Sequence, residues 1–102
     1  MELALTGDPI TAERALRHGL INALTEPGKA LEGTIQLARR VTRNGPLALA
    51  ASKKVLTHAM DWPMDEAFAR QEAVVVPVFG SDDAQEGAQA FAEKRQPHWQ
   101  GH

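Results

Sequence analysis

The stretch SDDAQEGAQAFAEKRQP, residues 81–97, decides the fold class of this chain. Its first residue, Ser81, is of a type preferred at helix N-caps, and the two aspartates after it lie where the helix dipole favours negative charge. Pro97 cannot continue a helix and marks its end. The side chains between them recur at helical spacing on one face, namely Ala84, Ala88, Phe91 and Arg95. We therefore predict a helix that begins after Ser81 and stops at Gln96–Pro97.

The segment before this helix, from about Met64 to Phe79, has the same periodicity but contains a proline. Its predicted face consists of Met64, Ala67, Phe68, Gln71, Val74, Val75 and Val78. Taken alone, Val74–Phe79 would also suit a strand because it is rich in β-branched residues. Pro77 would remove a helical hydrogen bond and clash with the preceding turn. We expect the helix to kink or to end early at Pro77.

Two more helices are predicted in the middle of the chain. The first runs from about Ala30 to Arg43, with apolar positions at Leu31, Ile35, Ala38 and Val41. Pro46 is acceptable at the first position of a helix and opens the second. The apolar stripe of this second helix includes Leu47, Ala51 and Val55. Trp62–Pro63 ends it.

The N-terminal segment contains the shortest predicted elements. Residues 1–5 have the character of the end of a helix, which Gly7 can close in a left-handed conformation. Thr11 is a suitable N-cap for a helix over Ala12–His18. Leu20–Leu24 is a brief apolar run that favours one short strand. The sequence as a whole predicts a mainly α fold with five to six helices and one short strand.

Composition excludes several classes of function. The 102 residues are 43% hydrophobic and 24% charged, which is ordinary for a globular protein. The net charge of −2 gives no basis for binding nucleic acid or an anionic membrane. Cysteine is absent, and neither a membrane-spanning run nor a secretory signal is present in the sequence. We expect a cytoplasmic protein without a membrane or nucleic-acid partner.

No catalytic or metal-binding constellation is evident from the residues themselves. The four histidines, His18, His58, His98 and His102, are scattered and have no metal-ligand spacing. Asp82, Asp83 and Glu86 could suggest a cation site, but the preceding N-cap serine favours ordinary charge at a helix N-terminus. Lys53–Lys54 and Lys94–Arg95 suit solvated helix faces. Spacing alone therefore supports a helical domain with neither metal ligands nor catalytic residues.

Three segments in order resemble the crotonase superfamily, also called the enoyl-CoA hydratase/isomerase family. The first is similar to an "LTG, I-x-A-x-x-A, GLVN" stretch, and consists of Leu5-Thr6-Gly7, Ile10, Ala12, Ala15 and Gly19-Leu20-Ile21-Asn22. The second, similar to "N-x-P-x-A, then K", consists of Asn44, Pro46, Ala48 and Lys53. The third is similar to the family's C-terminal motif and consists of Ser81-Asp82-Asp83, Glu86-Gly87, Ala90-Phe91, Glu93-Lys94-Arg95 and Pro97. The resemblance covers nearly the whole chain.

The resemblance implies the C-terminal helical part of a ClpP/crotonase-like fold. Residues 1–28 would be the end of the spiral-core region, and residues 29–102 a C-terminal helical trimerisation domain. In that family, an oxyanion hole and glutamates upstream of the "LTG" segment act on acyl-CoA thioesters, as in the lyase and isomerase reactions of fatty-acid metabolism. None of those groups has a counterpart here, so this chain alone is predicted to be inactive. Coenzyme A would enter as the thioester substrate, and no separate cofactor is implied.

The resemblance also implies two residues that contact coenzyme A. Lys94 matches a lysine that reaches the adenine or phosphate end of CoA, often a CoA bound to the neighbouring subunit. Phe79 falls near the aromatic-bearing end of the preceding helix, which can flank adenine. The Val74–Val78 sequence with Pro77 is unusual for that helix. The plainer interpretations are a solvated surface lysine and a packed phenylalanine.

Two functions follow from these observations. One is a portion of an enoyl-CoA hydratase or isomerase, assembled as a homo-oligomer (trimer or hexamer) or with a core-bearing chain. The alternative is a non-catalytic helical oligomerisation or binding module. The module would bury the apolar faces of Ala30–Arg43 and Met64–Phe79 between chains, because soluble monomers rarely expose large apolar patches. The acyl group and the choice between hydratase and isomerase do not follow from this sequence.

Overall fold

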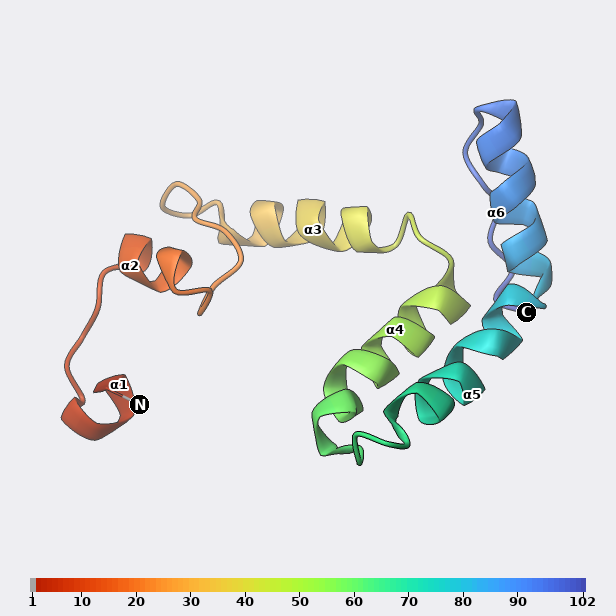
Figure 1. The fold of residues 1–102 in the computed structure, drawn as a ribbon. Coiled ribbons are helices and arrows are strands. Elements are labelled where there is room, and N and C mark those ends of the chain that lie inside the picture. The colour runs from red at the N-terminus through yellow and green to blue at the C-terminus, as the bar shows by residue number, and fades with distance from the viewer. Residues whose placement is uncertain (1) are drawn as a thin grey trace. The chain divides into compact units, whose positions relative to one another are not determined.

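A computed structural model describes residues 2–102, and helices joined by turns make up that part of the chain, with no strand in it (Figure 1). The predicted mainly helical class is therefore confirmed. The chain divides into two compact units, residues 1–39 and 40–102. This division lies within helix α3 (Ala30–Val41), whereas the boundary predicted at residues 28 and 29 precedes that helix. The assignment of the two segments to a core region and a trimerisation domain stays a prediction.

The first unit contains α1 (Glu2–Thr6), α2 (Ala12–Arg17) and most of α3. The Thr11 hydroxyl accepts a hydrogen bond from the Arg14 N–H at 3.2 Å, so the predicted N-cap is confirmed. Gly7 ends α1 with a φ of 70°, a left-handed conformation that glycine adopts without steric cost. Local signals in the sequence therefore set both ends of this connection.

The short strand predicted at Leu20–Leu24 is wrong. The Leu20 N–H donates back to the Ala15 carbonyl at 2.9 Å and closes the end of α2 instead of joining a sheet. A strand needs a neighbour to receive its backbone hydrogen bonds, and no other strand is present in residues 2–102. The apolar run bends at residues 20–22 and is largely exposed, with Leu20 60% and Leu24 41% exposed.

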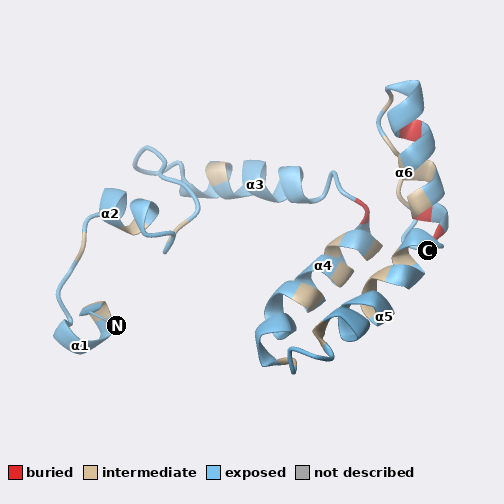
Figure 2. Ribbon diagram, in the orientation of Figure 1, coloured by how far each residue is buried: buried red, intermediate tan, exposed pale blue. Residues whose placement is uncertain are grey.

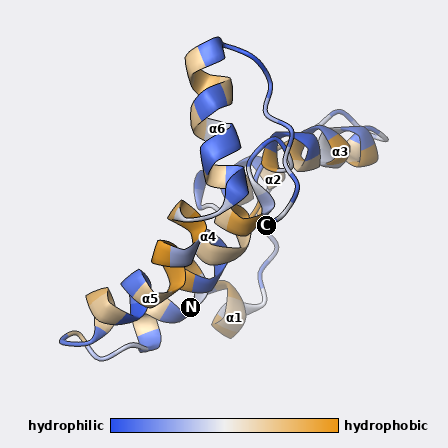
Figure 3. Cartoon of the chain, turned by 90° about the vertical axis from the view of Figure 1, so that its right-hand side faces the viewer, coloured by the Kyte–Doolittle hydropathy of each residue, from blue (hydrophilic) through white to orange (hydrophobic). Residues whose placement is uncertain are grey.

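In the second unit, α4 (Pro46–His58) and α5 (Ala67–Phe79) lie side by side and are joined through the 3₁₀ turn η1 (Ala59–Asp61) (Figure 1). The half-buried positions are Leu47, Leu49, Ala51 and Val55 on α4 and Ala67, Val74, Val75 and Val78 on α5. All but Leu49 belong to the predicted apolar faces, and Figure 3 shows the hydrophobic character of this pair. Met64 and Phe68, predicted on the same face, are instead 87% and 81% exposed.

Pro77 does not end α5 early, because the helix continues through Phe79. The proline lies in the last turn, so the helical hydrogen bond that it cannot donate is one near the end of the element. The segment Val74–Val78 is helical and not a strand; Val74, Val75 and Val78 are half-buried in a helix that packs against α4. Tertiary packing thus decides a stretch whose local propensity was ambiguous.

The last helix, α6 (Asp82–Glu93), follows α5 after Gly80–Ser81. The Ser81 hydroxyl accepts a hydrogen bond from the Ala84 N–H at 3.1 Å, which confirms the predicted cap. Ala90, which is 1% exposed, is the one buried hydrophobic residue among residues 2–102. Figure 2 shows that most of the described chain is exposed. The described part of the chain therefore has almost no core of its own.

Candidate ligand-binding site at the end of α6

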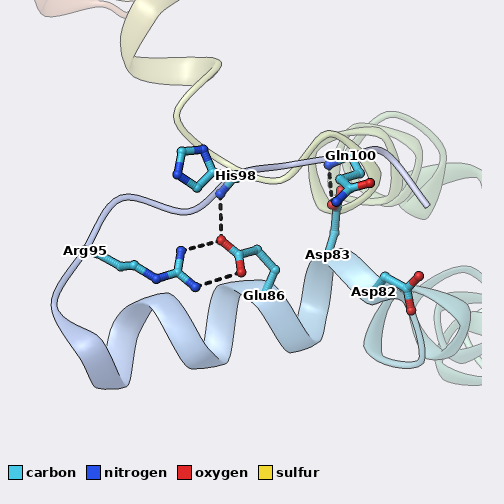
Figure 4. A pocket seen from close by; sticks show the side chains of 6 residues that line it. All are labelled: Asp82, Asp83, Glu86, Arg95, His98 and Gln100. Atoms are coloured by element: carbon cyan, nitrogen blue, oxygen red, sulfur yellow. Dashed lines mark hydrogen bonds and ion pairs between the residues drawn. The ribbon is translucent and has the colours of Figure 1, made fainter.

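The chain after α6 turns back and runs beside that helix, held by the carboxylate of Asp83 (Figure 4). The Gln100 N–H donates to Asp83 Oδ1 at 2.6 Å, and the Gly101 N–H donates to Asp83 Oδ2 at 3.0 Å. The Asp83 N–H in turn donates to the His102 carbonyl at 3.0 Å. Asp83 is only 4% exposed, so its charge is compensated by these tail amides and not by solvent.

Glu86 and Arg95 form the centre of a second set of contacts between α6 and this tail (Figure 4). Arg95 donates from Nη1 and Nη2 to the two carboxylate oxygens of Glu86, at 2.6 and 2.8 Å. The His98 N–H donates to the same carboxylate at 2.7 Å. This bidentate geometry is the strong form of an arginine–carboxylate pair. The side chains are 34% and 22% exposed for Arg95 and Glu86, so solvent screens the pair only in part.

The hydrogen bonds of this cluster shift the ionisation of its members. Donation from Arg95 and from the His98 N–H lowers the pKa of Glu86 from 4.5 to about 2. The Glu93 carboxylate receives the Gln89 amide at 2.8 Å and the Arg95 Nε–H at 2.6 Å, and these bonds lower its pKa. The two carboxylates raise the pKa of Arg95. All three groups are charged throughout the neutral pH range.

The indole of Trp99 joins the tail to the beginning of α4. Its Nε1–H donates to the Arg43 carbonyl at 2.9 Å. The ring lies close to two glycines: a side-chain carbon added at Gly45 would be 3.6 Å from the ring, and one added at Gly87 would be 3.1 Å from it. We call the contacts made by Asp83, Glu86, Arg95 and Trp99 the C-terminal clasp.

The clasp changes how the acidic cluster is understood. Ordinary helix-terminal charge describes Asp82, which is exposed, but not Asp83 or Glu86, whose carboxylates bind the tail. Neither this role of the two carboxylates nor the contacts of Trp99 were predicted from the sequence. A signal was available in Gly87, because glycine inside a helix costs stability unless something approaches the backbone closely. The arginine and the glutamate of the C-terminal motif are here partners of one another.

Lys94 lies where α6 ends and holds an unusual backbone conformation. Its φ and ψ are 55° and 36°, and it is the one non-glycine residue with positive φ in residues 2–102. The Lys94 N–H donates to the Phe91 carbonyl at 3.3 Å, and the Arg95 N–H donates to the Ala90 carbonyl at 3.0 Å. These two bonds form a Schellman motif, whose left-handed position is usually glycine. The Lys94 side chain is exposed, with no ion-pair partner among residues 2–102.

The chain does not bring the two predicted CoA-contacting residues together. Phe79 ends α5 and is 77% exposed, whereas Lys94 follows the far end of α6. A helix of 12 residues is roughly 18 Å long, so α6 separates the two side chains by about that length. If both contact coenzyme A, they bind distant parts of one molecule or belong to different copies.

A ligand pocket, a metal site and a membrane span each have structural requirements that residues 2–102 can be compared with. The hollow beside the clasp has a volume of about 270 Å³ and is lined by Asp82, Asp83, Glu86, Arg95, His98 and Gln100. Most of its charged groups already bind one another or the tail. Across these residues no three His, Asp or Glu side chains are placed to hold a metal ion. No helix in the same range is both long and apolar enough to cross a membrane.

Several known proteins are similar to this chain along nearly its whole length. The family model described as enoyl-CoA hydratase/isomerase matches residues 1–102. Carnitinyl-CoA dehydratase of Salmonella arizonae is 37% identical over 99% of this chain and 40% of its own length. An enoyl-CoA hydratase of Mycobacterium tuberculosis is 42% identical over 97% of this chain and 37% of its own length.

Solved structures give the same result in three dimensions. An enoyl-CoA hydratase from Mycobacterium tuberculosis H37Rv has a TM-score of 0.95 and 55% identity, and covers 100% of this chain and 40% of its own. A second enoyl-CoA hydratase, from Mycobacterium marinum, has a TM-score of 0.95, 54% identity and the same coverage. The chain thus spans about 40% of the length of the proteins it matches. It belongs to the enoyl-CoA hydratase/isomerase family.

Proposed function

We propose that this chain serves as the C-terminal helical part of an enoyl-CoA hydratase/isomerase-family protein that acts on acyl-CoA thioesters. The observation that carries the proposal is similarity along the whole chain to a hydratase and a dehydratase of CoA esters, each of which is more than twice as long. The residues that perform the reaction, an oxyanion hole and catalytic glutamates, would lie in the part of the relatives' length that these 102 residues do not match. Coenzyme A enters as the thioester of the substrate.

The test of this proposal is a crotonyl-CoA hydration assay on the chain alone and together with the upstream core region of a relative. We expect no turnover by the chain alone, because neither preorganised oxyanion donors nor paired carboxylates are available to it. We expect turnover when the core region is supplied. Measurable hydration by the chain alone would overturn the claim that the catalytic groups lie elsewhere.

Lys94 is the residue we propose for binding the phosphate or adenine end of coenzyme A. Its ammonium is exposed at a helix end, and its left-handed backbone is a conformation that lysine adopts only at a cost. Glycine at this position would remove the backbone strain. The presence of lysine therefore points to a role for its side chain. Phe79 is a second proposed contact, through its exposed ring at the end of α5. Loss of CoA affinity in Lys94→Ala would support the first assignment, and unchanged affinity would remove it.

Association with other chains is also part of the proposal. The second unit leaves large apolar side chains exposed, among them Leu56, Met60, Met64, Phe68, Val76, Phe79 and Phe91. A trimer or hexamer, or a complex with a core-bearing chain, would cover them. We place this assembly in the cytoplasm, with no membrane or nucleic-acid partner.

A non-catalytic oligomerisation module is the second candidate function, and the same apolar faces favour it. Light scattering and the complementation assay separate the two candidates. A stable oligomer that never supports turnover with a core region would favour the module. Turnover on addition of the core region would favour the enzyme portion.

A further inference from the structure

In the C-terminal clasp, the carboxylates pair with Arg95 and not with the neighbouring Lys94. The guanidinium of Arg95 is shared between Glu86 and Glu93 through hydrogen bonds of 2.6 to 2.8 Å. The ammonium of Lys94, between Glu93 and Arg95 in the sequence, has no ion-pair partner in residues 2–102. Of the two adjacent cations, Arg95 is therefore occupied and Lys94 is open to an anionic ligand.

The same contacts act on the backbone that carries Lys94. The chain reverses direction at this residue, through the left-handed conformation and the two Schellman hydrogen bonds. Arg95 comes immediately after the reversal, and its side chain is held against Glu86, which lies more than two helical turns earlier on α6. The His98 N–H binds the same carboxylate and holds the next part of the tail. Glu86 thus anchors the chain directly beyond Lys94 (Figure 4).

We propose that Glu86 is a positioning residue for Lys94: by anchoring Arg95 it holds the helix-ending turn in one conformation and directs the Lys94 ammonium toward a phosphate group of coenzyme A. This inference rests on the proposed function, in which Lys94 contacts CoA. The physical advantage is preorganisation, because a lysine whose backbone is already fixed loses less freedom on binding. If the end of α6 were flexible, the ammonium would occupy many orientations and would lose more conformational entropy on binding.

The competing explanation is that Glu86 stabilises the tail and has no effect on binding. A double-mutant cycle on CoA affinity distinguishes the two, because a residue that acts through Lys94 has no effect once Lys94 is removed. The variants are Glu86→Gln, which keeps the side-chain volume and removes the charge, Lys94→Ala, and the two combined. Calorimetric titration with coenzyme A gives the affinity, and the melting temperature of each variant reports folding separately.

We expect Lys94→Ala to weaken CoA binding about tenfold or more, since a charge-assisted hydrogen bond is lost. Glu86→Gln should weaken it about three- to tenfold, and should cause no further loss in the Lys94→Ala background. Arg95→Lys serves as a second variant that keeps the charge and removes the bidentate geometry, and it should behave as Glu86→Gln does. It keeps the test valid if Glu86→Gln does not fold.

The matched control is Asp83→Asn, which weakens another anchor of the tail without touching Arg95. CoA affinity should be retained in this variant. A loss as large as that of Glu86→Gln would mean that tail anchoring in general matters, and would overturn the positioning role. Additive losses in the Glu86→Gln, Lys94→Ala double variant would overturn it as well. Unchanged affinity in Lys94→Ala would instead overturn the CoA contact itself, so the two failures are distinguishable.

Discussion

At the scale of single residues, Lys94 is the position where local stability and the proposed function diverge. L-amino acids other than glycine pay about 1–2 kcal/mol for the left-handed helical conformation that Lys94 holds. Glycine is the usual residue at this point of a Schellman motif. The turn and the clasp impose this conformation on Lys94, although its backbone energy would be lower with glycine at the position.

Lys94→Gly should therefore stabilise the fold and weaken ligand binding in the same variant. We expect the free energy of unfolding to rise by about 1 kcal/mol in urea denaturation, because the backbone strain is relieved. CoA affinity should fall as in Lys94→Ala. Lys53→Gly is the matched control: it replaces a lysine inside α4 and should destabilise by about 1 kcal/mol. A destabilised Lys94→Gly would contradict the strain argument.

Glu86 makes the clasp sensitive to acid. Its pKa is lowered from 4.5 to about 2 by the hydrogen bonds from Arg95 and the His98 N–H. Its charged pair therefore contributes fully to stability above pH 4.5, and this contribution is lost as the pH falls from 4.5 toward about 2. Circular dichroism and NMR titration of the Glu86 carboxyl carbon measure the effect. The Glu86→Gln variant should lose less stability over the same pH interval, although Glu93 still titrates there.

At the scale of elements, the helices follow from local signals and the clasp does not. Thr11, Ser81 and Pro46 mark helix starts in both sequence and structure, because caps act within three residues. The clasp joins Trp99 to Arg43, and nothing local indicates which distant carbonyl an indole will meet. For the same reason the strand at Leu20–Leu24 could not be judged from its composition.

The packing of Trp99 against Gly87 gives an element-scale prediction. A methyl group at Gly87 would be 3.1 Å from the indole, which also lies close to Gly45 and is held by its hydrogen bond to the Arg43 carbonyl. Gly87→Ala should therefore destabilise the unit by about 1–2 kcal/mol, despite the better helix propensity of alanine. Thermal denaturation measures this. In a Trp99→Leu background Gly87→Ala should instead stabilise the unit. A loss of stability of the same size in that background would rule out the indole as the cause.

At the scale of the whole molecule, α5 is apolar on two sides. Val74, Val75 and Val78 are half-buried, whereas Phe68 and Phe79 are 81% and 77% exposed. Exposed apolar side chains that gather on one element mark a surface for another molecule. The sequence pattern predicted the half-buried valines correctly but placed Phe68 on the same face, because it could not separate residues buried within this chain from those that another chain would cover.

Val76→Asp tests whether that second side is an interface. Val76 is 55% exposed, so the charge should cost little in the isolated chain, and it should weaken association about 100-fold or more because it would be buried between chains. Light scattering over a range of concentrations measures the shift toward lower mass. Glu72→Gln, also on an exposed position of α5, serves as the control and should leave the mass unchanged. An unaffected mass in Val76→Asp would place the interface elsewhere.

The tail that Asp83 and Glu86 hold has a consequence for amide exchange with deuterated water. The N–H groups of His98, Gln100 and Gly101 belong to no helix or strand, yet each is bonded to a carboxylate. They should exchange slowly, at rates nearer to those of α6 than to those of an irregular terminus. Protection of the His98 amide would then measure how often the tail separates from Glu86, and protection of the Gln100 and Gly101 amides how often it separates from Asp83.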